Sequence, residues 1–232
     1  MTGTFPTDTA PPNEATLLVP DVIPIFPLPG TVLLPGEVLP LRVFEPRYRA
    51  MVKDSLDGHR VIGVVAYRPD PVALSDERPP VETVGCLGLI AQHQELADGE
   101  YLMWLLGLER FSIDEEVLTD TLYRQVRVTY TPDEESADVL AGIHPLSTEM
   151  KMLLPSVLES DDATRRELAG QLDDVSDSQL IALGAQILGL DADRKQVLLE
   201  SRSQMERFTL LWEDLFRRLE EEDLSIDASQ LN

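Results

Sequence analysis

The chain has a single cysteine, Cys86, among its 232 residues, so it cannot form an intrachain disulfide. Cys86 lies in the apolar run Val84–Ile90, where a buried and unreactive thiol is more common than a nucleophile. Proteins without disulfides are typical of reducing compartments, and the sequence therefore predicts a cytoplasmic protein.

Basic residues are also few. The chain has 19 Lys and Arg against 42 Asp and Glu, a formal net charge of -23. Binding to nucleic acid or to an anionic membrane draws its strength from clustered Lys and Arg. Arginines do gather at Arg42, Arg47 and Arg49, but the acids Glu37 and Glu45 interrupt them. We therefore expect neither nucleic acid nor a membrane surface as a partner.

Long apolar runs are missing as well. The run Val32–Val43 is interrupted by two prolines, a glycine and a glutamate, so no segment is expected to cross a bilayer. The first basic side chain is Arg42, and the positively charged region that a signal peptide needs is therefore absent.

Catalytic and cofactor motifs are absent too. Of the three lysines, Lys53, Lys151 and Lys195, none follows a glycine or precedes Ser or Thr, which excludes a phosphate-binding loop. The three histidines lie far apart and start no zinc motif, and one cysteine cannot build a thiolate site. Neither a nucleophile elbow nor a dinucleotide fingerprint occurs. The sequence predicts a protein that is not an enzyme and that uses no metal or cofactor.

The rest of the composition is that of a globular protein, with 43% hydrophobic and 26% charged residues. Residues 1–20 are rich in Thr, Pro and Ala and predict a disordered tail. From Ile23 to Tyr130 short apolar runs are broken by Pro and Gly, as in strands, whereas after Pro132 the apolar period is helical. We expect an α+β protein with a β-barrel at residues 21–131 and a helical bundle at residues 132–232.

The strand pattern is dense enough to predict a closed or nearly closed small barrel. Strands or extended segments are expected at Ile23–Leu28, Val32–Leu34, Val38–Val43, Val61–Ala66, Val84–Gln94, Tyr101–Glu109, Phe111–Val117 and Leu122–Tyr130. One early helix should begin at Pro46, because the missing N–H of proline costs nothing in a first turn.

The second half predicts several short helices and one long one. They are expected at Ser147–Leu158, at Asp162–Leu172, at Ser178–Leu188, after Asp191, and from about Ser201. Ser176 with Gln179, and Ser201 with Gln204, have the spacing of capping boxes. The last helix carries an apolar stripe at three- and four-residue spacing, which is typical of packing on other helices.

Several segments resemble one known family. Ile23–Gly30 followed by Leu39–Tyr48 is similar to the start of the Lon protease N-terminal domain. The segments Val84–Gly88, Gly107–Phe111 and Arg194–Glu200 then occur in the order that the family has. The resemblance covers nearly all of the chain after residue 20.

This resemblance implies a PUA-like small β-barrel followed by a C-terminal α-helical bundle. In the family this region is associated with substrate recognition and oligomer assembly. The ATPase and Ser-Lys peptidase domains of the full protease are not in this sequence, so the chain resembles the stand-alone form. The resemblance therefore implies a non-catalytic module that binds polypeptide segments or a protein partner.

Two other functions stay open at this point. The same fold carries a small-molecule pocket in cereblon-type proteins, so a ligand receptor with a pocket between barrel and helices is the alternative. Trp104, Tyr48 and Arg42 are residues of the kind that line such pockets. PUA-like folds also bind RNA, but the acidity argues against this. The apolar segment Val32–Pro35 either captures a partner or fills the core.

Six residues are the candidates for a partner- or ligand-binding site: Arg42, Glu45, Arg47, Tyr48, Trp104 and Arg110. The functional interpretation is a polar and aromatic cluster at one edge of the barrel. The structural interpretation is that Glu45 pairs with an arginine at the corner between strand and helix, while Trp104 belongs to the core.

Overall fold

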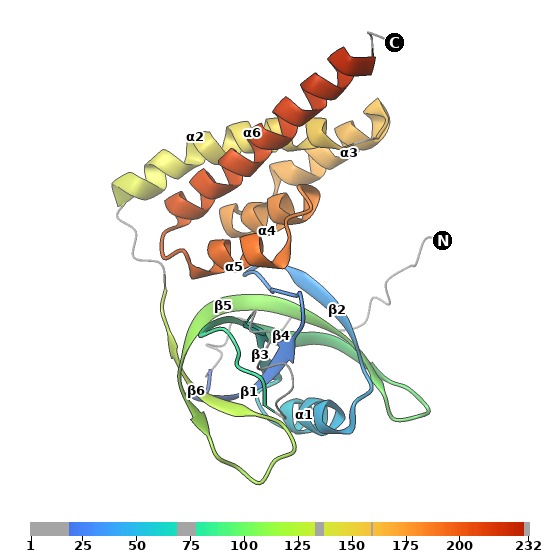
Figure 1. The fold of residues 1–232 in the computed structure, drawn as a ribbon, viewed down its shortest axis with the longest axis vertical. Coiled ribbons are helices and arrows are strands. Elements are labelled where there is room, and N and C mark those ends of the chain that lie inside the picture. Colours follow the sequence, from blue (N-terminus) through green and yellow to red (C-terminus); the bar gives the residue numbers. More distant parts are fainter. Residues whose placement is uncertain (1–18, 69–77, 133–136, 159, 230–232) are drawn as a thin grey trace.

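The computed structural model describes residues 19–68, 78–132, 137–158 and 160–229. Figure 1 shows two halves: the strands and one helix form the first, and the remaining helices stack above it. This confirms the predicted α+β class, with a barrel followed by helices. The tail predicted at residues 1–20 lies almost entirely outside the described residues.

Within the described residues six strands form one mixed sheet: β1 (Val22–Leu28), β2 (Val38–Val43), β3 (Val61–Ala66), β4 (Val84–Glu95), β5 (Tyr101–Val117) and β6 (Gln125–Tyr130). Their order is β2-β5-β4-β3-β1-β6, and β6 also pairs with β5. That second pairing closes β1, β3, β4, β5 and β6 into a barrel, as predicted, while β2 lies outside it on β5. Only the β1–β3 pair is parallel among these pairings.

The long strand β5 differs from the prediction of two strands separated at Arg110. It runs without a break through 17 residues. Its pairing with β4 shifts by one residue between Gly107 and Glu109, which leaves Leu108 as the extra residue of a bulge. A bulge bends a strand and resets its alternation of faces, so the sequence pattern breaks although the strand continues.

Because of this bend, the two halves of β5 belong to different parts of the sheet. Its second half belongs to the barrel, and its first half lies between β2 and the end of β4. We call this three-stranded part, residues 38–43, 92–95 and 101–106, the flap. The β4–β5 hairpin carries it away from the barrel (Figure 1).

Helix α1 (Pro46–Asp57) packs on β1 and β3. It begins at Pro46 as predicted, and Gly58 caps its C-terminus. It buries Tyr48, Met51, Val52 and Ser55.

The helical half consists of α2 (Ala137–Leu153), the 3-10 turn η2 (Leu154–Val157), α3 (Asp162–Asp173), α4 (Asp177–Ile187), α5 (Ala192–Glu200) and α6 (Gln204–Ser229). Helix α2 begins ten residues earlier than predicted and continues through Pro145. A proline inside a helix is unfavourable, but tertiary packing overrides propensity here, because Ile143 and Met150 on either side of it are fully buried.

One of the two predicted capping boxes is confirmed, and Asp191 caps the helix expected after it. Ser176 and Gln179 form a capping box, and the Asp191 carboxylate accepts the Arg194 N–H. The box predicted at Ser201 is wrong. Ser201 ends α5, and the Ser203 hydroxyl accepts the Glu206 N–H at the start of α6 instead.

One hydrophobic core runs through both halves of the molecule. It joins side chains of α1 and the sheet to side chains of α2, α4, α5 and α6, while a smaller cluster around Phe111 fills the inside of the barrel. Val32, Leu33 and Leu34 are at most 4% exposed and belong to the shared core. Val32, Leu33 and Leu34 therefore fill the core, while Pro35 is partly exposed. The division at residues 131 and 132 stays a prediction.

Candidate functional site

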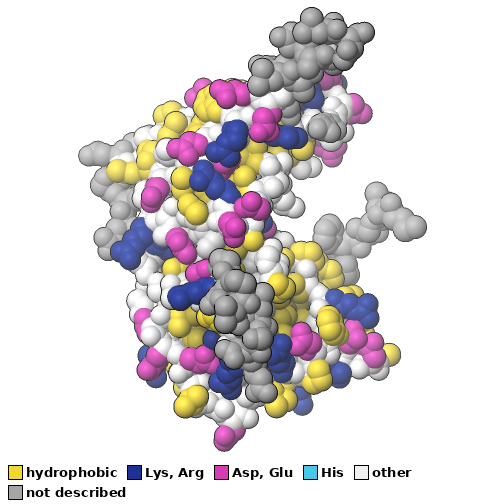
Figure 2. Space-filling view, in the orientation of Figure 1, with side chains coloured by type: hydrophobic (Ala, Val, Ile, Leu, Met, Phe, Trp, Pro, Cys, Tyr) yellow, Lys and Arg dark blue, Asp and Glu magenta, His cyan; other side chains and the backbone are white. Residues whose placement is uncertain are grey.

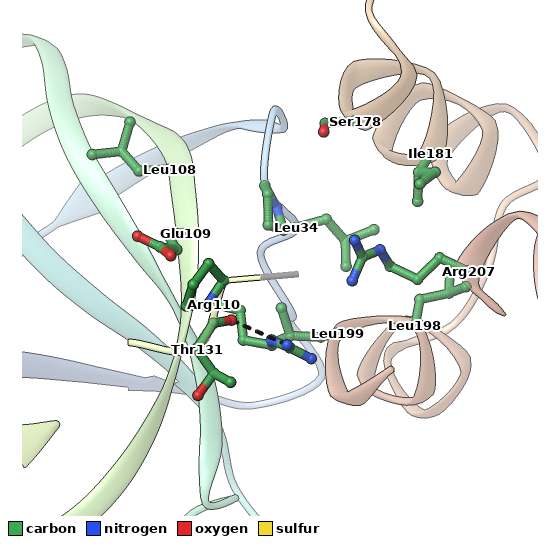
Figure 3. A pocket seen from close by; sticks show the side chains of 12 residues that line it. Leu34, Leu108, Glu109, Arg110, Thr131, Ser178, Ile181, Leu198, Leu199 and Arg207 are labelled. Atoms are coloured by element: carbon green, nitrogen blue, oxygen red, sulfur yellow. Dashed lines mark hydrogen bonds between the residues drawn. The ribbon is translucent and has the colours of Figure 1, made fainter. Parts of the chain in front are cut away.

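The barrel and the helices enclose a pocket of about 300 Å³. Apolar side chains form most of its wall, from the loop before β2, from β5 and from α4 and α5: Leu34, Pro35, Leu108, Ile181, Leu198 and Leu199. Figure 3 shows Leu34 between the two halves, with Arg110 and Arg207 beside it. This volume is at the lower end for small-molecule sites. We call it the junction pocket.

Arg110 joins the two halves at this pocket. Its guanidinium is buried and donates to the carbonyl oxygens of Glu200 and Ser201 at the end of α5, and to that of Thr131. Figure 3 marks the bond to Thr131. A cation at the C-terminal end of a helix also opposes the negative end of its dipole. The contacts of Arg110 are therefore those of a residue that fixes the helices on the barrel.

A second connection comes from the loop before β2. Lys195 of α5 binds the Glu37 carboxylate at 2.7 Å, and both side chains are mostly buried. Gly36 has a φ of +84°, and its Cα lies so close to Gln179 of α4 that a Cβ would be 3.2 Å from the Gln179 Cα. The two halves are thus held together by charge, hydrogen bonds and close backbone packing.

The flap has two different faces. Residues that pair across an antiparallel ladder lie on the same face. Leu39 with Leu105, and Leu41 with Met103, face the core. Val38 pairs with Leu106, Pro40 with Trp104, and Arg42 with Leu102. Gln92 and Gln94 of β4 pair with Trp104 and Leu102 from the other side, so these eight side chains lie on the opposite face.

That opposite face is partly open to solvent, with apolar side chains along β5 and the polar Arg42, Gln92 and Gln94 on its two sides. Val38 is 55% exposed, and Leu102, Trp104 and Leu106 are partly exposed. None of the three β5 residues belongs to a core cluster or packs against one among the described residues. We call the five apolar residues Val38, Pro40, Leu102, Trp104 and Leu106 the flap face. Figure 2 shows hydrophobic side chains gathered where β2 lies, with charged side chains around them.

Charged residues border the flap face at its hairpin end. Arg42 donates to Glu100 at 2.6 Å, and its side chain is 62% exposed. Glu95 and Asp98 lie in the same hairpin and add negative charge. An apolar patch with a polar border is the usual composition of a surface that binds other proteins.

The corner between β2 and α1 holds three of the predicted site residues. The Arg47 guanidinium binds Glu45 at 2.9 Å and lies 4.5 Å from the centre of the Tyr48 ring. Tyr48 is buried and packs on Phe26, with the ring centres 4.4 Å apart. Burial raises the pKa of Tyr48, so its hydroxyl stays protonated.

The Glu45–Arg47 pair has a smaller structural role than the sequence suggested. Both side chains are 44% exposed, so solvent screens the pair. We expect Glu45→Ala to change the free energy of unfolding by about 0–1 kcal/mol, below the range expected for a buried pair. Urea denaturation measures this, and a loss of 2 kcal/mol or more, roughly twice the upper limit for an exposed pair, would contradict it.

The structure distributes the six predicted residues over three places. Arg42 and Trp104 lie together on the open side of the flap, while Glu45, Arg47 and Tyr48 lie at the corner. Arg110 lies at the junction pocket. The predicted single cluster is therefore not formed. The ligand-receptor hypothesis expected Trp104, Tyr48 and Arg42 to line a pocket between barrel and helices. None of the three lines the junction pocket.

Sequence reasoning missed Leu102, Leu106 and Val38 as site residues. The signal was present in the alternation of Tyr101–Leu106, in which both faces are apolar. Antiparallel strands with one solvated face alternate between apolar and polar residues, so apolar residues on both faces predict a strand that is covered on both faces. The structure leaves the second face of this strand partly exposed.

In the part of the chain that the structure describes, no group of three or more His, Cys, Asp or Glu side chains is placed to hold a metal ion. Over the same residues, no helix is long and apolar enough to span a membrane.

Comparisons with known proteins agree with this fold. The family model of the ATP-dependent protease La (Lon) substrate-binding domain matches residues 22–215. Lon protease 2 of Myxococcus xanthus is 30% identical over 224 residues, which are 93% of this chain and 26% of that protein. Lon protease of Anaeromyxobacter dehalogenans is 29% identical over 209 residues. The chain spans about a quarter of the length of these relatives.

Solved structures show the same architecture. The N-terminal domain of the Mycobacterium avium complex Lon protease aligns with a TM-score of 0.65 and 22% identity, over 84% of this chain and 97% of that one. A Lon N-terminal domain protein from Xanthomonas campestris aligns with a TM-score of 0.57 and 24% identity. Since the family model spans most of the chain, this protein belongs to the family of Lon substrate-binding domains.

Proposed function

We propose that this protein is a non-catalytic binding module that takes up extended, partly apolar polypeptide segments on the flap face. The observation that carries the proposal is a sheet face with three large apolar side chains of β5 that are only partly buried and belong to neither core cluster of the described residues. Covering such a face with an apolar segment removes it from water, which is favourable at about 25 cal/mol per Å².

The shape of the site supports an extended ligand. Trp104 lies at the centre of the flap face, with Leu102 and Leu106 two residues away on either side along β5. Side chains of an extended segment repeat at the same two-residue spacing, so alternate residues of a bound segment can contact all three. Aromatic residues at the centre of a patch carry much of the binding energy of many interfaces.

The family match supports the kind of partner, because the matched model is that of a substrate-binding domain. Charge adds a preference. The net charge of -23, and the acids at the hairpin, favour segments that mix apolar residues with Lys or Arg. Small and exposed contacts of this kind are transient, so we expect Kd values of about 1 μM or weaker, near -8 kcal/mol.

We predict that Trp104→Ala weakens binding of such peptides about tenfold or more, while the fold stays intact, because Trp104 is outside the core. Fluorescence anisotropy with peptides selected on an array measures the affinity, and thermal denaturation checks the fold. Phe216→Ala is the matched control, since Phe216 is an aromatic residue of α6 that is 53% exposed.

If Trp104→Ala and Phe216→Ala weaken peptide binding equally, the peptide does not bind specifically at the flap face, and the assignment of the site would be overturned. Binding of single-stranded RNA more tightly than any peptide would overturn the function itself. The charge preference has its own test: raising the salt concentration from low to 0.5 M should weaken only peptides that carry Lys or Arg, because salt screens exposed charges.

A further inference from the structure

A second cavity lies at the corner between β2 and α1, outside the flap face. Its volume is about 150 Å³, half that of the junction pocket. Three arginines and three tyrosines make up most of its lining: Arg47, Arg78, Arg124, Tyr48, Tyr67 and Tyr123. No acidic residue is among the described residues that line it, although the chain has a net charge of -23. We call it the corner cavity.

The elements that form the corner cavity are far apart in the sequence. Arg47 and Tyr48 lie in the first turn of α1, and Tyr67 directly follows β3. Arg78 precedes β4, and Tyr123 and Arg124 precede β6. The barrel fold thus gathers cationic and aromatic side chains from four segments. The N-terminus of α1 adds the positive end of its dipole; its first turn has no acidic residue, and its N-cap is Glu45, which binds Arg47.

All three guanidinium nitrogens of Arg124 donate to acceptors within the protein. Arg124 donates through Nε and one terminal nitrogen to Glu116, and through the other to the Pro79 carbonyl oxygen. Its side chain is only 18% exposed, so it forms the fixed wall of the cavity.

The other two arginines keep free donors. A guanidinium has five N–H groups. Arg47 uses two of its nitrogens on Glu45, and Arg78 uses one on Glu116, in the contacts between described residues. Both side chains are partly exposed, at 44% and 60%, so water satisfies the remaining donors until a ligand displaces it.

The walls restrict the class of ligand. Phenol rings and the two prolines Pro27 and Pro79 surround the arginines, so the ligand carries an apolar or aromatic body beside its negative charge. The volume is about half the lower limit for drug-sized ligands, so only a small terminal group enters. A planar carboxylate matches the fork of a guanidinium, and the acidic protein as a whole repels multiply charged anions more strongly.

We propose that the corner cavity binds the carboxylate of a polypeptide, with the C-terminal residue as the best match, through Arg47 and Arg78, and that its neighbouring side chain packs on the tyrosines. The proposal rests on the proposed function only in that the ligand is a polypeptide. The corner cavity and the flap face have no residue in common, so an experiment can reject either proposal without rejecting the other.

The test uses two probes that differ in one group: N-acetyl-alanyl-phenylalanine with a free carboxylate, and the same dipeptide as its amide. NMR spectra of the arginine Nε–H groups follow the titration. We expect the acid to shift the Arg47 and Arg78 signals, and the amide to leave them unchanged. Arg47→Gln and Arg78→Gln should each weaken binding of the acid about tenfold.

Arg127→Gln is the matched control, because Arg127 is 47% exposed, pairs with Glu115 and lies outside the cavity. It should bind the acid as the unchanged protein does. Thermal denaturation confirms that the variants fold. Trp104→Ala should also bind the acid normally, and Arg47→Gln should still bind amidated apolar peptides on the flap face, which separates the two proposals.

Three results would overturn the proposal. Equal binding of acid and amide would show that the charge has no role, and absence of binding at millimolar concentration would show that there is no site. Tighter binding of inorganic phosphate than of the acid would assign the cavity to phosphate. An N-acetylated dipeptide amide with an internal glutamate distinguishes a side-chain carboxylate from a chain terminus, and binding equal to that of the acid would remove the preference for the terminus.

Discussion

Gly107→Ala is expected to lower the free energy of unfolding by several kcal/mol, about 3–5, or to prevent folding altogether. Gly107 lies at the bulge of β5, where the loop before β2 crosses the strand. Its N–H donates to the Glu37 carbonyl oxygen, and its own carbonyl oxygen accepts the Gly36 N–H. A Cβ on Gly107 would overlap the carbonyl oxygen of Leu34, which is backbone and cannot rotate away.

Chemical denaturation of Gly107→Ala, followed by circular dichroism, measures this effect. Gly170→Ala is the matched control, because a Cβ there meets nothing within 4 Å and Gly170 lies inside helix α3. The control should gain up to about 1 kcal/mol, since alanine is the better helix former. Near-equal stability of the two variants would show that the loop does not pack on β5 as described.

Arg110→Met is expected to cost about 3 kcal/mol or more, because it removes a charged donor from three buried or partly buried carbonyl oxygens. Methionine keeps much of the side-chain volume, so the loss reports the hydrogen bonds rather than a cavity. Lysine should restore little of the stability, because an ammonium group lacks the planar fork that reaches several acceptors at once.

Arg127→Met serves as the control for this prediction as well, with an expected change within about 0.5 kcal/mol for an exposed pair. Urea denaturation of both variants gives the comparison. If Arg110→Met unfolds at the same urea concentration as the unchanged protein, Arg110 is not the connection between barrel and helices. In that case the functional interpretation of Arg110 would return.

Much of the fold could be predicted from the sequence because local signals agree with the final packing. The prolines and glycines before Val38 place β2, Pro46 starts α1, and Ser176 caps α4. The errors have a common cause. A strand break was expected at Arg110 and a helix start only after Pro145, while contacts between distant residues keep the strand and the helix continuous there.

The candidate sites were less predictable, because they depend on register. Trp104 and Arg42 were both chosen from the sequence, but only the pairing of β2 with β5 places them on one face with Leu102 and Leu106. Tyr67 and Arg124 of the corner cavity are 57 positions apart, and no local pattern connects them. The structural interpretation of the sequence placed Trp104 in the core. In the structure Trp104 belongs to neither core cluster.

The position of Pro40 on β2 affects whether another strand can add to the outer edge of the sheet. The Gly107 N–H donates to the Glu37 carbonyl oxygen, and residues of an antiparallel strand alternate between bonding to the partner strand and pointing away from it. Pro40 is three residues after Glu37, so its backbone nitrogen and carbonyl point away from β5, along the outer edge of the sheet. A proline offers no N–H there, and an incoming strand cannot complete its hydrogen-bonded ladder. On the proposed function, a polypeptide segment bound on the adjoining flap face would therefore not extend the sheet at this edge, which disfavours cross-β growth.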